Sequence, residues 1–264
     1  MRVRKRFGQH FLAPAWADKV VEAIAPSPSD RFLEIGPGPG VLTLRLAARA
    51  AHVTAIEIDR DLAVDLRAEA PPNVEIVTAD VLDVDLASFA GPAPLRVAGN
   101  LPYNVSSPIL FKLLLARKGD SHLFSDATVM LQREVVDRLV ARPGTKDYGV
   151  LTIFMNAAAD AQRLLTLPPG AFRPAPKVQS AVVRLTFRPS AVPPDLEPTF
   201  DGMVRSMFTQ RRKTLLNALR PFAASIGADA GPAIRAAGID AAARPETLDL
   251  DRLLALARSL KPKV

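Results

Sequence analysis

The stretch RFLEIGPGPG, residues 31–40, decides the fold that we expect for this chain. Its first half is a short apolar run that predicts a buried β-strand, and its second half places glycines at positions 36, 38 and 40. Glycine lets the backbone turn sharply and approach a ligand closely, and the following helix N-terminus offers free N–H groups. The spacing G-x-G-x-G after an acidic residue differs from the G-x-G-x-x-G of dinucleotide sites and favours a methionine moiety. Alone, this turn is also compatible with any tight strand-to-helix connection.

Around this stretch, short apolar runs typical of β-strands alternate with helical patterns through two-thirds of the chain. We predict strands at residues 31–35, 53–57, 74–77, 95–98, 127–131, 161–167 and 178–187, and helices at 41–50, 62–69, 108–115 and 148–159. The alternation predicts an α/β domain with a mostly parallel sheet that is covered on both faces.

A change of pattern near residue 190 predicts a second domain. Four prolines, at positions 189, 193, 194 and 198, are typical of a linker. Beyond them, apolar residues recur with helical spacing at 200–208, at 215–219 and at 248–260. We therefore expect an α/β domain over residues 1–189 and a small all-α domain over residues 190–264.

The composition indicates a polyanionic partner. The 264 residues include 34 Lys and Arg against 27 Asp and Glu, a net charge of +7. Basic residues gain affinity for nucleic acid by releasing condensed counterions, although a solvated basic surface is the alternative. Two clusters stand out, one with Arg4, Lys5 and Arg6 and the other with Arg211, Arg212 and Lys213.

The absence of Cys excludes disulfides, thiolate metal sites and Cys nucleophiles, and we expect no metal site. No apolar run approaches the roughly 20 residues that span a bilayer. We therefore expect a cytoplasmic protein that does not bind membranes.

Acidic residues follow two further predicted strands. Glu57 ends the second strand, 21 residues after Gly36, where a carboxylate can accept hydrogen bonds from ribose hydroxyls. Asp80 and Val81 follow the third strand, where a carboxylate and a backbone N–H could hold an adenine ring. Each alone is also typical of an exposed strand end, but ligands bind at the carboxyl ends of neighbouring parallel strands.

The sharpest motif is Asn100-Leu101-Pro102-Tyr103, directly after the strand that ends at residue 98. A proline turn with a packed Tyr is one interpretation. The other is a clamp for the amino group of adenine, in which the Asn100 oxygen and a backbone carbonyl accept both amino hydrogens. The nitrogen lone pair would then point at a methyl donor while Tyr103 stacks on the base, so catalysis would rest on proximity and electrostatics. A base in structured RNA must be turned out to reach such a pocket.

Together these motifs resemble the ribosomal RNA adenine dimethyltransferases, the KsgA family. The resemblance extends over nearly the whole chain and rests on residues 4–12, 34–40, 55–57, 100–103, 172–178 and 211–215. It implies a Rossmann-like S-adenosylmethionine-dependent methyltransferase domain with a helical rRNA-binding domain. It also implies N6-dimethylation of two adjacent adenines near the 3′ end of 16S rRNA, in the small ribosomal subunit or its precursor, by a monomer.

Carried over by position, the resemblance assigns residues to roles. Those expected to contact S-adenosylmethionine, or to lie beside its methyl group, are Gly36, Gly38, Glu57, Asp80, Val81 and Asn100. His10 and Leu12 would close over the cofactor from the N-terminal arm. Many members have Asn at position 10; the His10 ring still donates a hydrogen bond, although an exposed loop imidazole is the alternative.

The resemblance also suggests a second aromatic residue at the target base and a set of phosphate contacts. Phe172 would stack on the base opposite Tyr103, with a core Phe as the alternative. The phosphate contacts would come from Arg4, Lys5, Arg6, Arg211, Arg212 and Lys213.

Three other functions stay open at this point. One is a large-subunit rRNA adenine methyltransferase of the antibiotic-resistance type. The second is a non-catalytic rRNA-binding assembly factor, against which the intact site residues argue. The third is a DNA adenine methyltransferase, a class that usually has a second Pro where Leu101 stands.

Overall fold

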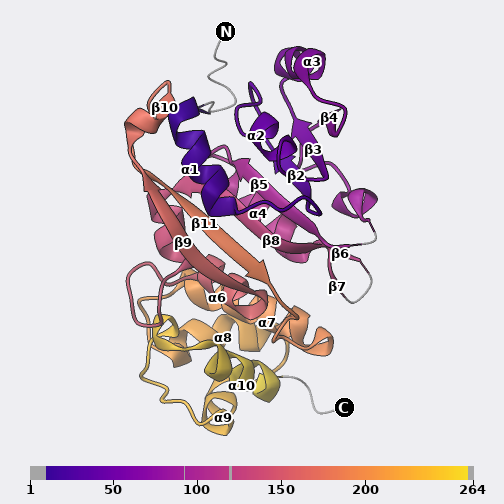
Figure 1. The fold of residues 1–264 in the computed structure, drawn as a ribbon. Helices are drawn as coiled ribbons and strands as arrows, with labels where there is room; N and C mark the ends of the chain where they lie inside the picture. The colour runs from indigo at the N-terminus through magenta and orange to yellow at the C-terminus, as the bar shows by residue number, and fades with distance from the viewer. Residues whose placement is uncertain (1–9, 92, 119–120, 261–264) are drawn as a thin grey trace. The chain divides into compact units, whose positions relative to one another are not determined.

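The structure, a computed structural model, describes residues 10–91, 93–118 and 121–260 and divides into two compact units (Figure 1). The first unit comprises residues up to Val136 together with Ala159–Pro189, and the second comprises Asp137–Ala158 and the residues from Ser190 onward. The sequence placed 137–158 in the first domain. The structure differs because Tyr148, Ile153 and Ala157 are buried in the apolar core of the C-terminal helices.

A seven-stranded sheet forms the centre of the first unit, in the order β4-β3-β2-β5-β8-β11-β9. Strands β2, β3, β4, β5 and β8 are parallel, whereas β11 is antiparallel to both of its neighbours. The mostly parallel sheet that the sequence predicts is therefore confirmed. The strands are β2 (Arg31–Ile35), β3 (His52–Glu57), β4 (Val74–Thr78), β5 (Leu95–Asn100), β8 (Phe124–Gln132), β9 (Ala159–Leu167) and β11 (Ser180–Phe187).

The sheet order positions a ligand site. From β2 the chain builds β3 and β4 on one side and then returns to place β5 on the other side. The strand order thus reverses between β2 and β5, and ligands of open α/β sheets bind at the carboxyl ends of the strands at such a point. We therefore expect the site beside the ends of β2 and β5.

Helices flank this sheet, and two of its α-helices were not predicted from the sequence. Helix α1 (Pro14–Ile24) begins with Pro at its first position and buries Ala17, Val20, Val21 and Ile24. Helix α2 (Thr43–Ala47) is shorter than the expected 41–50, because turns occupy both of its flanks. The remaining helices of this part are α3 (Arg60–Glu69), α4 (Ser106–Leu115), η2 (Leu86–Phe89) and η3 (Pro169–Ala171). The second unpredicted helix, α5 (Arg133–Leu139), begins in the first unit and ends in the second.

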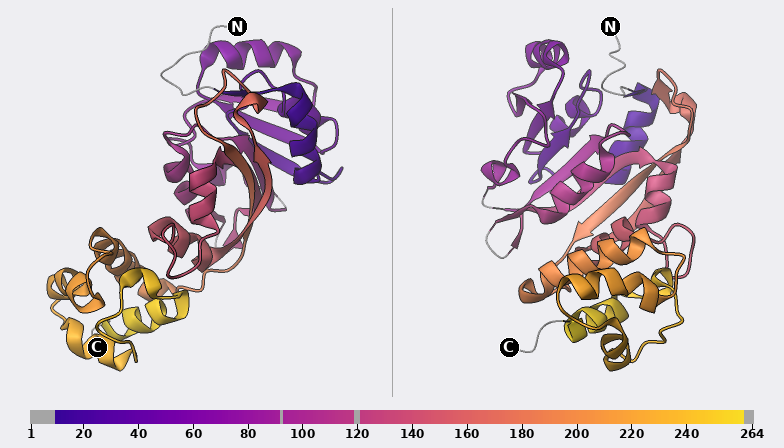
Figure 2. Two further views of the ribbon diagram at one scale, coloured as in Figure 1. Left: turned by 90° about the vertical axis from the view of Figure 1, so that its left-hand side faces the viewer. Right: turned by 180° about the vertical axis from the view of Figure 1, so that it is seen from behind.

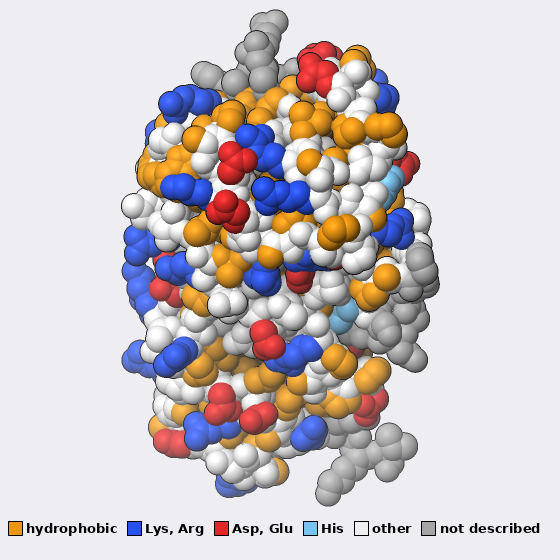
Figure 3. Space-filling model, viewed as in Figure 1, with side chains coloured by type: hydrophobic (Ala, Val, Ile, Leu, Met, Phe, Trp, Pro, Cys, Tyr) orange, Lys and Arg blue, Asp and Glu red, His pale blue; other side chains and the backbone are white. Residues whose placement is uncertain are grey.

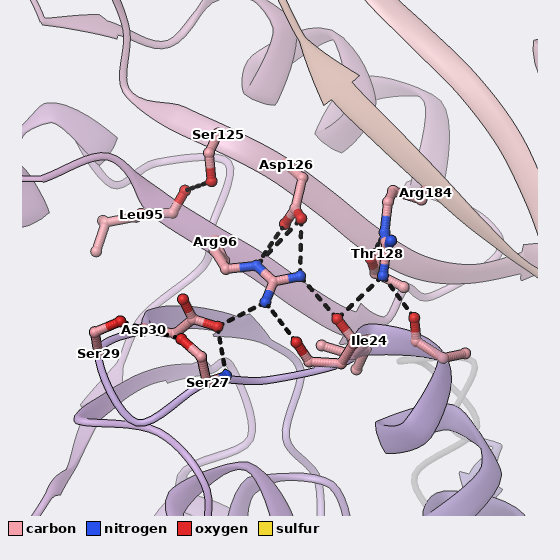
Figure 4. Close-up of polar contacts among 12 residues, drawn as sticks. Ile24, Ser27, Ser29, Asp30, Leu95, Arg96, Ser125, Asp126, Thr128 and Arg184 are labelled. Carbon is pink, nitrogen blue, oxygen red and sulfur yellow. Dashed lines mark hydrogen bonds and ion pairs between the residues drawn. The ribbon is translucent and has the colours of Figure 1, made fainter.

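Two arginines of the sheet hold the C-terminal end of α1 (Figure 4). Arg96 on β5 forms ion pairs with Asp30 at 2.6 Å and Asp126 at 2.8 Å, and its guanidinium also donates to the carbonyls of Ile24 and Ala25. Arg184 on β11 donates to the Ile24 carbonyl as well. The last carbonyls of a helix have no partner within it, so these side chains satisfy them and fix α1 on the sheet.

Two short ladders complete the first unit. Strand β1 (Phe11–Leu12) pairs with β10 (Phe172–Arg173), and β6 (Arg117–Lys118) pairs with β7 (Ser121–His122). The Ala13 amide extends the first ladder by donating to the Ala171 carbonyl at 2.8 Å. This ladder ties the N-terminal arm to the loop between β9 and β11.

The second unit is helical, and its C-terminal helices form a compact bundle (Figure 2). Its core includes Phe200, Met203, Val204 and Met207, the face that the helical spacing predicts. Pro198 lies in the first turn of α7, where proline is tolerated, and is not part of a linker. The elements are α6 (Val150–Ala158), η4 (Pro194–Leu196), α7 (Glu197–Thr209), α8 (Leu215–Ser225), α9 (Ala230–Ala236), η5 (Pro245–Thr247) and α10 (Leu250–Leu260). Within the described residues, no helix is long and apolar enough to cross a bilayer.

Candidate active site

A cavity of about 280 Å³ opens at the carboxyl ends of β2, β3, β4 and β5. This volume is near the lower end of small-molecule sites, which span about 300–1,000 Å³. Its position agrees with the reversal of strand order between β2 and β5. The lining residues are His10, Phe11, Ile35, Gly36, Gly38, Ile56, Glu57, Ile58, Ala79, Asp80, Val81, Leu82, Asn100, Leu101, Pro102, Tyr103, Asn104, Val105 and Ile109.

The glycine loop after β2 forms one wall of this cavity. Gly36 and Gly38 have φ angles of 68° and 57°, in the left-handed region that residues with a Cβ rarely adopt. A Cβ on Gly38 would also lie 3.0 Å from the Phe11 ring. The loop therefore requires glycine both for its backbone conformation and for the close approach of the N-terminal arm.

Glu57 holds the glycine loop to the end of β3. Its two carboxylate oxygens accept hydrogen bonds from the Gly38 amide at 2.9 Å and from the Asp59 amide at 2.9 Å. The side chain is buried, and burial raises its pKa although these backbone N–H groups oppose that shift. Because each carboxylate oxygen accepts more than one hydrogen bond, Glu57 can still accept from a ligand hydroxyl.

The turn after β4 presents a second carboxylate to the cavity. Asp80 Oδ1 accepts the Leu82 amide at 2.8 Å, and Lys112 Nζ donates to the Leu82 carbonyl at 2.6 Å. These bonds fix the turn so that Asp80 and Val81 both line the cavity, as expected from the sequence.

Asn100 ends β5 and lies at the centre of the site. Its Nδ2 donates to the His10 carbonyl at 2.6 Å, so its Oδ1 is turned away from that carbonyl. The next residue, Leu101, is buried, and its amide donates to the Met130 carbonyl at 3.2 Å. The start of the turn is therefore anchored to two neighbouring segments.

Tyr103 closes the same turn and is held at its hydroxyl. The Tyr103 hydroxyl lies 2.6 Å from Ser180 Oγ at the start of β11, and Ser180 is fully buried. Burial raises the pKa of Tyr103, so its hydroxyl is neutral at physiological pH. The ring of His10 stacks on that of Tyr103 with 5.5 Å between centroids. The aromatic platform is thus fixed from two sides.

Two predicted site residues lie elsewhere. Phe172 has no exposed surface and belongs to the core beneath α1, so the structure places it in the alternative role of a core Phe instead of in the base-binding cavity. Leu12, its partner across the β1–β10 ladder, is buried in the same core and lines a small neighbouring cavity instead of the main one. In the β1–β10 ladder both side chains point into the core. The sequence does not reveal this pairing, because the two residues are far apart in the chain.

The structure also adds site residues that the sequence analysis missed. Ile58 is 42% exposed and lines the cavity directly after Glu57, where it provides an apolar wall. Its position after a strand-end carboxylate is a signal that could have identified it. Ser180 is separated from Tyr103 by 77 residues, so no local motif links them.

Glu34 lies behind the glycine loop and is the least solvated carboxyl group near the site. It is 1% exposed, and its Oε2 has no hydrogen-bond partner among the described residues. Burial, with the nearby charge of Glu57, raises its pKa to about 8. Glu34 is therefore mostly protonated at neutral pH.

The expected RNA-binding residues have different surroundings. Arg4, Lys5 and Arg6 lie outside the described residues. In the second unit, Arg211 forms an ion pair with Glu246 at 2.8 Å and donates to the Lys146 carbonyl at 3.0 Å. Arg212 and Lys213 are exposed. Arg211 is therefore committed to an intramolecular contact, whereas its two neighbours face solvent.

The donor set of the cavity fits S-adenosylmethionine. Two strand-end carboxylates, Glu57 and Asp80, suit the hydroxyl and amino groups of a nucleoside, and Ile56 and Ile58 are apolar walls for its base. The glycine loop lets the backbone approach the amino-acid part. Among the described residues, no group of three or more His, Asp and Glu side chains is placed to hold a metal ion.

Comparisons with known proteins agree with this site. A model of the ribosomal RNA adenine dimethylase family matches residues 1–242. Ribosomal RNA small subunit methyltransferase A of Acidithiobacillus ferrooxidans is 44% identical over 98% of this chain and 94% of its own length. The same enzyme of Variovorax paradoxus is 44% identical over 98% of both chains.

Solved structures show the same fold. A dimethyladenosine transferase from Plasmodium falciparum is 26% identical, with a TM-score of 0.77 over 94% of this chain and 96% of its own. The 23S rRNA methyltransferase ErmE is 28% identical, with a TM-score of 0.69 over 96% of this chain and all of its own. On this evidence the chain belongs to the ribosomal RNA adenine dimethylase family, whose members are S-adenosylmethionine-dependent rRNA methyltransferases with a Rossmann-like fold.

Proposed function

We propose that this chain dimethylates N6 of two adjacent adenines near the 3′ end of 16S rRNA, in the small ribosomal subunit or its precursor. The observation that carries the proposal is the turn of residues 100–103, which places an oriented Asn amide and an anchored Tyr ring in one cavity. The near full-length likeness to small subunit methyltransferases supports the choice of substrate.

The donor side of the reaction would be bound at the ends of β2, β3 and β4. Glu57 would accept the ribose hydroxyls, Asp80 would accept from the adenine amino group of the cofactor, and the Val81 amide would donate to its ring. Gly36 and Gly38 would let the backbone approach the methionine part. S-adenosylmethionine, when bound, supplies a methyl group that is already activated on a sulfonium centre.

The acceptor side would be built by the turn after β5. In the first transfer, Asn100 Oδ1 and a backbone carbonyl of the turn would accept the two hydrogens of the target amino group. These bonds localise the nitrogen lone pair, which otherwise conjugates into the ring, and direct it at the methyl carbon. Transfer of the methyl group to this nitrogen would leave a neutral thioether on the donor, and the nitrogen, then cationic, would lose a proton to solvent. Because charge builds on that nitrogen, two fixed acceptors stabilise the transition state.

Tyr103 would hold the target base by stacking. A base in folded RNA must leave its helix to enter a cavity of this kind, and aromatic stacking compensates part of that cost. The bond to Ser180 and the contact with His10 keep the ring in place before the base arrives. The geometry thus supports catalysis by positioning, with no general base required before attack.

A surface of the second unit is the proposed site for RNA phosphates. On the face in Figure 3, Lys and Arg side chains lie among Asp and Glu, so net charge alone does not define such a surface. Three segments converge around Arg211 and Glu246, through bonds of Arg211 to Lys146, Gly144 to Glu246 and Leu215 to Ala243. The exposed basic residues on these segments are Arg142, Lys146, Arg212, Lys213 and Arg244.

Salt dependence tests this surface. Affinity for RNA falls as salt rises, so the slope of log affinity against log salt is negative. Removing Arg212 and Lys213 together should make this slope less steep by about one to two, since each phosphate contact contributes roughly 0.7–0.9. A control that removes Arg235 and Arg258, exposed on α9 and α10, deletes the same charge elsewhere in the unit. Equal slopes for the two double variants would mean that the loss of charge anywhere in the unit explains the effect, and would contradict a phosphate contact at Arg212 and Lys213.

Transfer of labelled methyl groups to ribosomal particles tests the function itself. Small subunits that lack the modification, large subunits and duplex DNA would be incubated with enzyme and S-adenosylmethionine, and the digested products analysed. Dimethyladenosine confined to small subunits is the expected result, and an Asn100→Ala variant should abolish it. Label in large subunits would instead support a 23S rRNA methyltransferase activity, as in ErmE. Binding of subunits without label would indicate an assembly factor.

The proposal includes a single chain that acts in the cytoplasm, where small subunits assemble. Light scattering of the purified protein at micromolar concentration should give the mass of one chain, 28.4 kDa. A dimer mass would contradict this part of the proposal.

A further inference from the structure

From the N-terminal arm, His10 contacts two other elements of the site at once, although the sequence suggests only a loop residue near the cofactor. Its carbonyl accepts from Asn100 Nδ2 at 2.6 Å, and its Nδ1 lies 2.7 Å from the Pro174 carbonyl. Its ring stacks on Tyr103 with an interplanar angle of 27°. The residue therefore joins the arm, the turn of residues 100–103 and the loop before β11.

The bond to Pro174 requires a proton on Nδ1 of the His10 ring. A carbonyl oxygen only accepts, so Nδ1 must carry the proton, and both the corresponding neutral tautomer and the imidazolium satisfy this requirement. The bond also continues the β1–β10 ladder, in which Phe11 pairs with Arg173 and Leu12 with Phe172. The side chain of His10 thus extends by one residue the contact that holds the arm.

The contact with Asn100 determines which way its amide faces. An amide whose orientation is free presents oxygen or nitrogen to a substrate, and only the oxygen accepts from an adenine amino group. Because Nδ2 is bound to the His10 carbonyl, Oδ1 is the atom left to face the substrate. Any displacement of the arm would release this constraint.

We propose that His10 is a positioning residue of methyl transfer: its imidazole latches the arm to Pro174, which holds the His10 carbonyl against Asn100 and the ring against Tyr103. This inference rests on the proposed function. His supplies both a donor and a ring at this position, whereas Asn would supply a donor but no ring. His10 acts through the acceptor side, so its loss should reduce turnover more than cofactor affinity.

Three variants separate the parts of this latch. His10→Phe keeps a ring for Tyr103 but has no donor for Pro174. His10→Asn keeps a donor but has no ring, and His10→Ala has neither. The matched control is His52→Gln at the start of β3, where His52 lies 3.9 Å from Glu75 at the amino ends of the parallel strands.

Each variant would be measured for turnover and KM on small subunits, for affinity to S-adenosylhomocysteine by calorimetry, and for amide hydrogen exchange. Turnover of His10→Ala should fall by about tenfold or more, because small misplacement of reacting groups is costly. His10→Phe and His10→Asn should each recover part of that loss, while product affinity stays within about threefold. Exchange at residues 11–13 and 171–173 should rise in His10→Ala and His10→Phe.

Two outcomes would overturn the inference. One is unchanged turnover in His10→Ala, and the other is a loss found entirely in cofactor affinity, which would make His10 a cofactor contact only. Hydrogen exchange distinguishes this failure from failure of the proposed function. If the wild type does not methylate small subunits, faster exchange in His10→Ala than in His52→Gln still supports the latch, and equal exchange refutes it.

Discussion

Removal of the Arg96 guanidinium should destabilise the α/β unit more than removal of a surface charge does. Arg96, Asp30 and Asp126 have side chains that are 14%, 19% and 15% exposed, so water screens their interaction weakly. Deleting one partner of a buried ion pair costs about 3–5 kcal/mol, because the remaining charges lose their compensation. Here Arg96→Ala removes the positive partner of two carboxylates, and it also removes the guanidinium donors to the Ile24 and Ala25 carbonyls.

Urea unfolding followed by tryptophan fluorescence is a suitable assay. Trp16 is the only Trp of the chain and lies on α1, next to the core of this unit. With a denaturant slope of about 2–3 kcal/mol per M, a loss of roughly 4 kcal/mol lowers the midpoint by about 1–2 M. Arg96→Lys keeps the charge without the forked geometry and should give an intermediate midpoint.

Arg188→Ala is the control, because its pair with Asp160 is largely exposed and the cost should be about 0–1 kcal/mol. Equal midpoints for Arg96→Ala and Arg188→Ala would refute the argument. Acid should also reduce the effect of Arg96→Ala. Burial alone would raise the pKa of Asp30, but bonds from Ser27 and Arg96 hold it below its ordinary value of 3.8. The stabilisation is therefore present above that value and is lost as pH falls below it.

Three further substitutions test the site. Asn100→Ala should lower turnover by about 10²–10³ while calorimetry shows cofactor affinity little changed; normal turnover would exclude the amino clamp. Glu57→Gln replaces an oxygen that accepts from Gly38 or Asp59 by a donor, and should weaken S-adenosylmethionine binding by about 10–100-fold, whereas unchanged affinity would remove its proposed role. The raised pKa of Glu34 in the folded state means that wild type loses stability as pH rises from 4.5 to about 8. Glu34→Gln has no such group to ionise, so its stability relative to wild type should increase over that range. Parallel thermal midpoints for wild type and Glu34→Gln over that range would contradict the assignment.

The central strands and the strand-end residues could be predicted from sequence because the relevant signals are local. Apolar runs followed by Gly, Glu, Asp and Asn place Gly36, Glu57, Asp80 and Asn100 at strand ends, and the parallel sheet brings those ends together. The strand at 31–35 was predicted with the bounds that the structure shows. Sequence order and side-chain type were therefore sufficient to predict that these four residues lie together in one cavity.

Features that depend on distant contacts were missed. Helix α1 starts from a proline after an unpredicted two-residue strand, and its end is satisfied by Arg96 and Arg184, which lie 72 and 160 residues from Ile24. A helix was predicted at residues 148–159, and the structure has α6 there, but only the packing of apolar side chains assigns the segment 137–158 to the second unit. Phe172 is an aromatic in a Pro-rich loop, and its burial follows from the β1–β10 ladder.

The single reversed strand of the sheet has a consequence for how this site can diversify. Because β11 runs against β8 and β9, its first residue, Ser180, lies beside their last residues, Gln132 and Leu167. The hairpin loop of residues 168–179 therefore reaches the same edge as the ends of β2, β3 and β4. On the proposed assignment, the ends of β2, β3 and β4 recognise the methyl donor, and the end of β5 with this loop recognises the acceptor. On this assignment, changes in the loop would alter which nucleic acid is modified and leave the residues that bind the methyl donor unchanged.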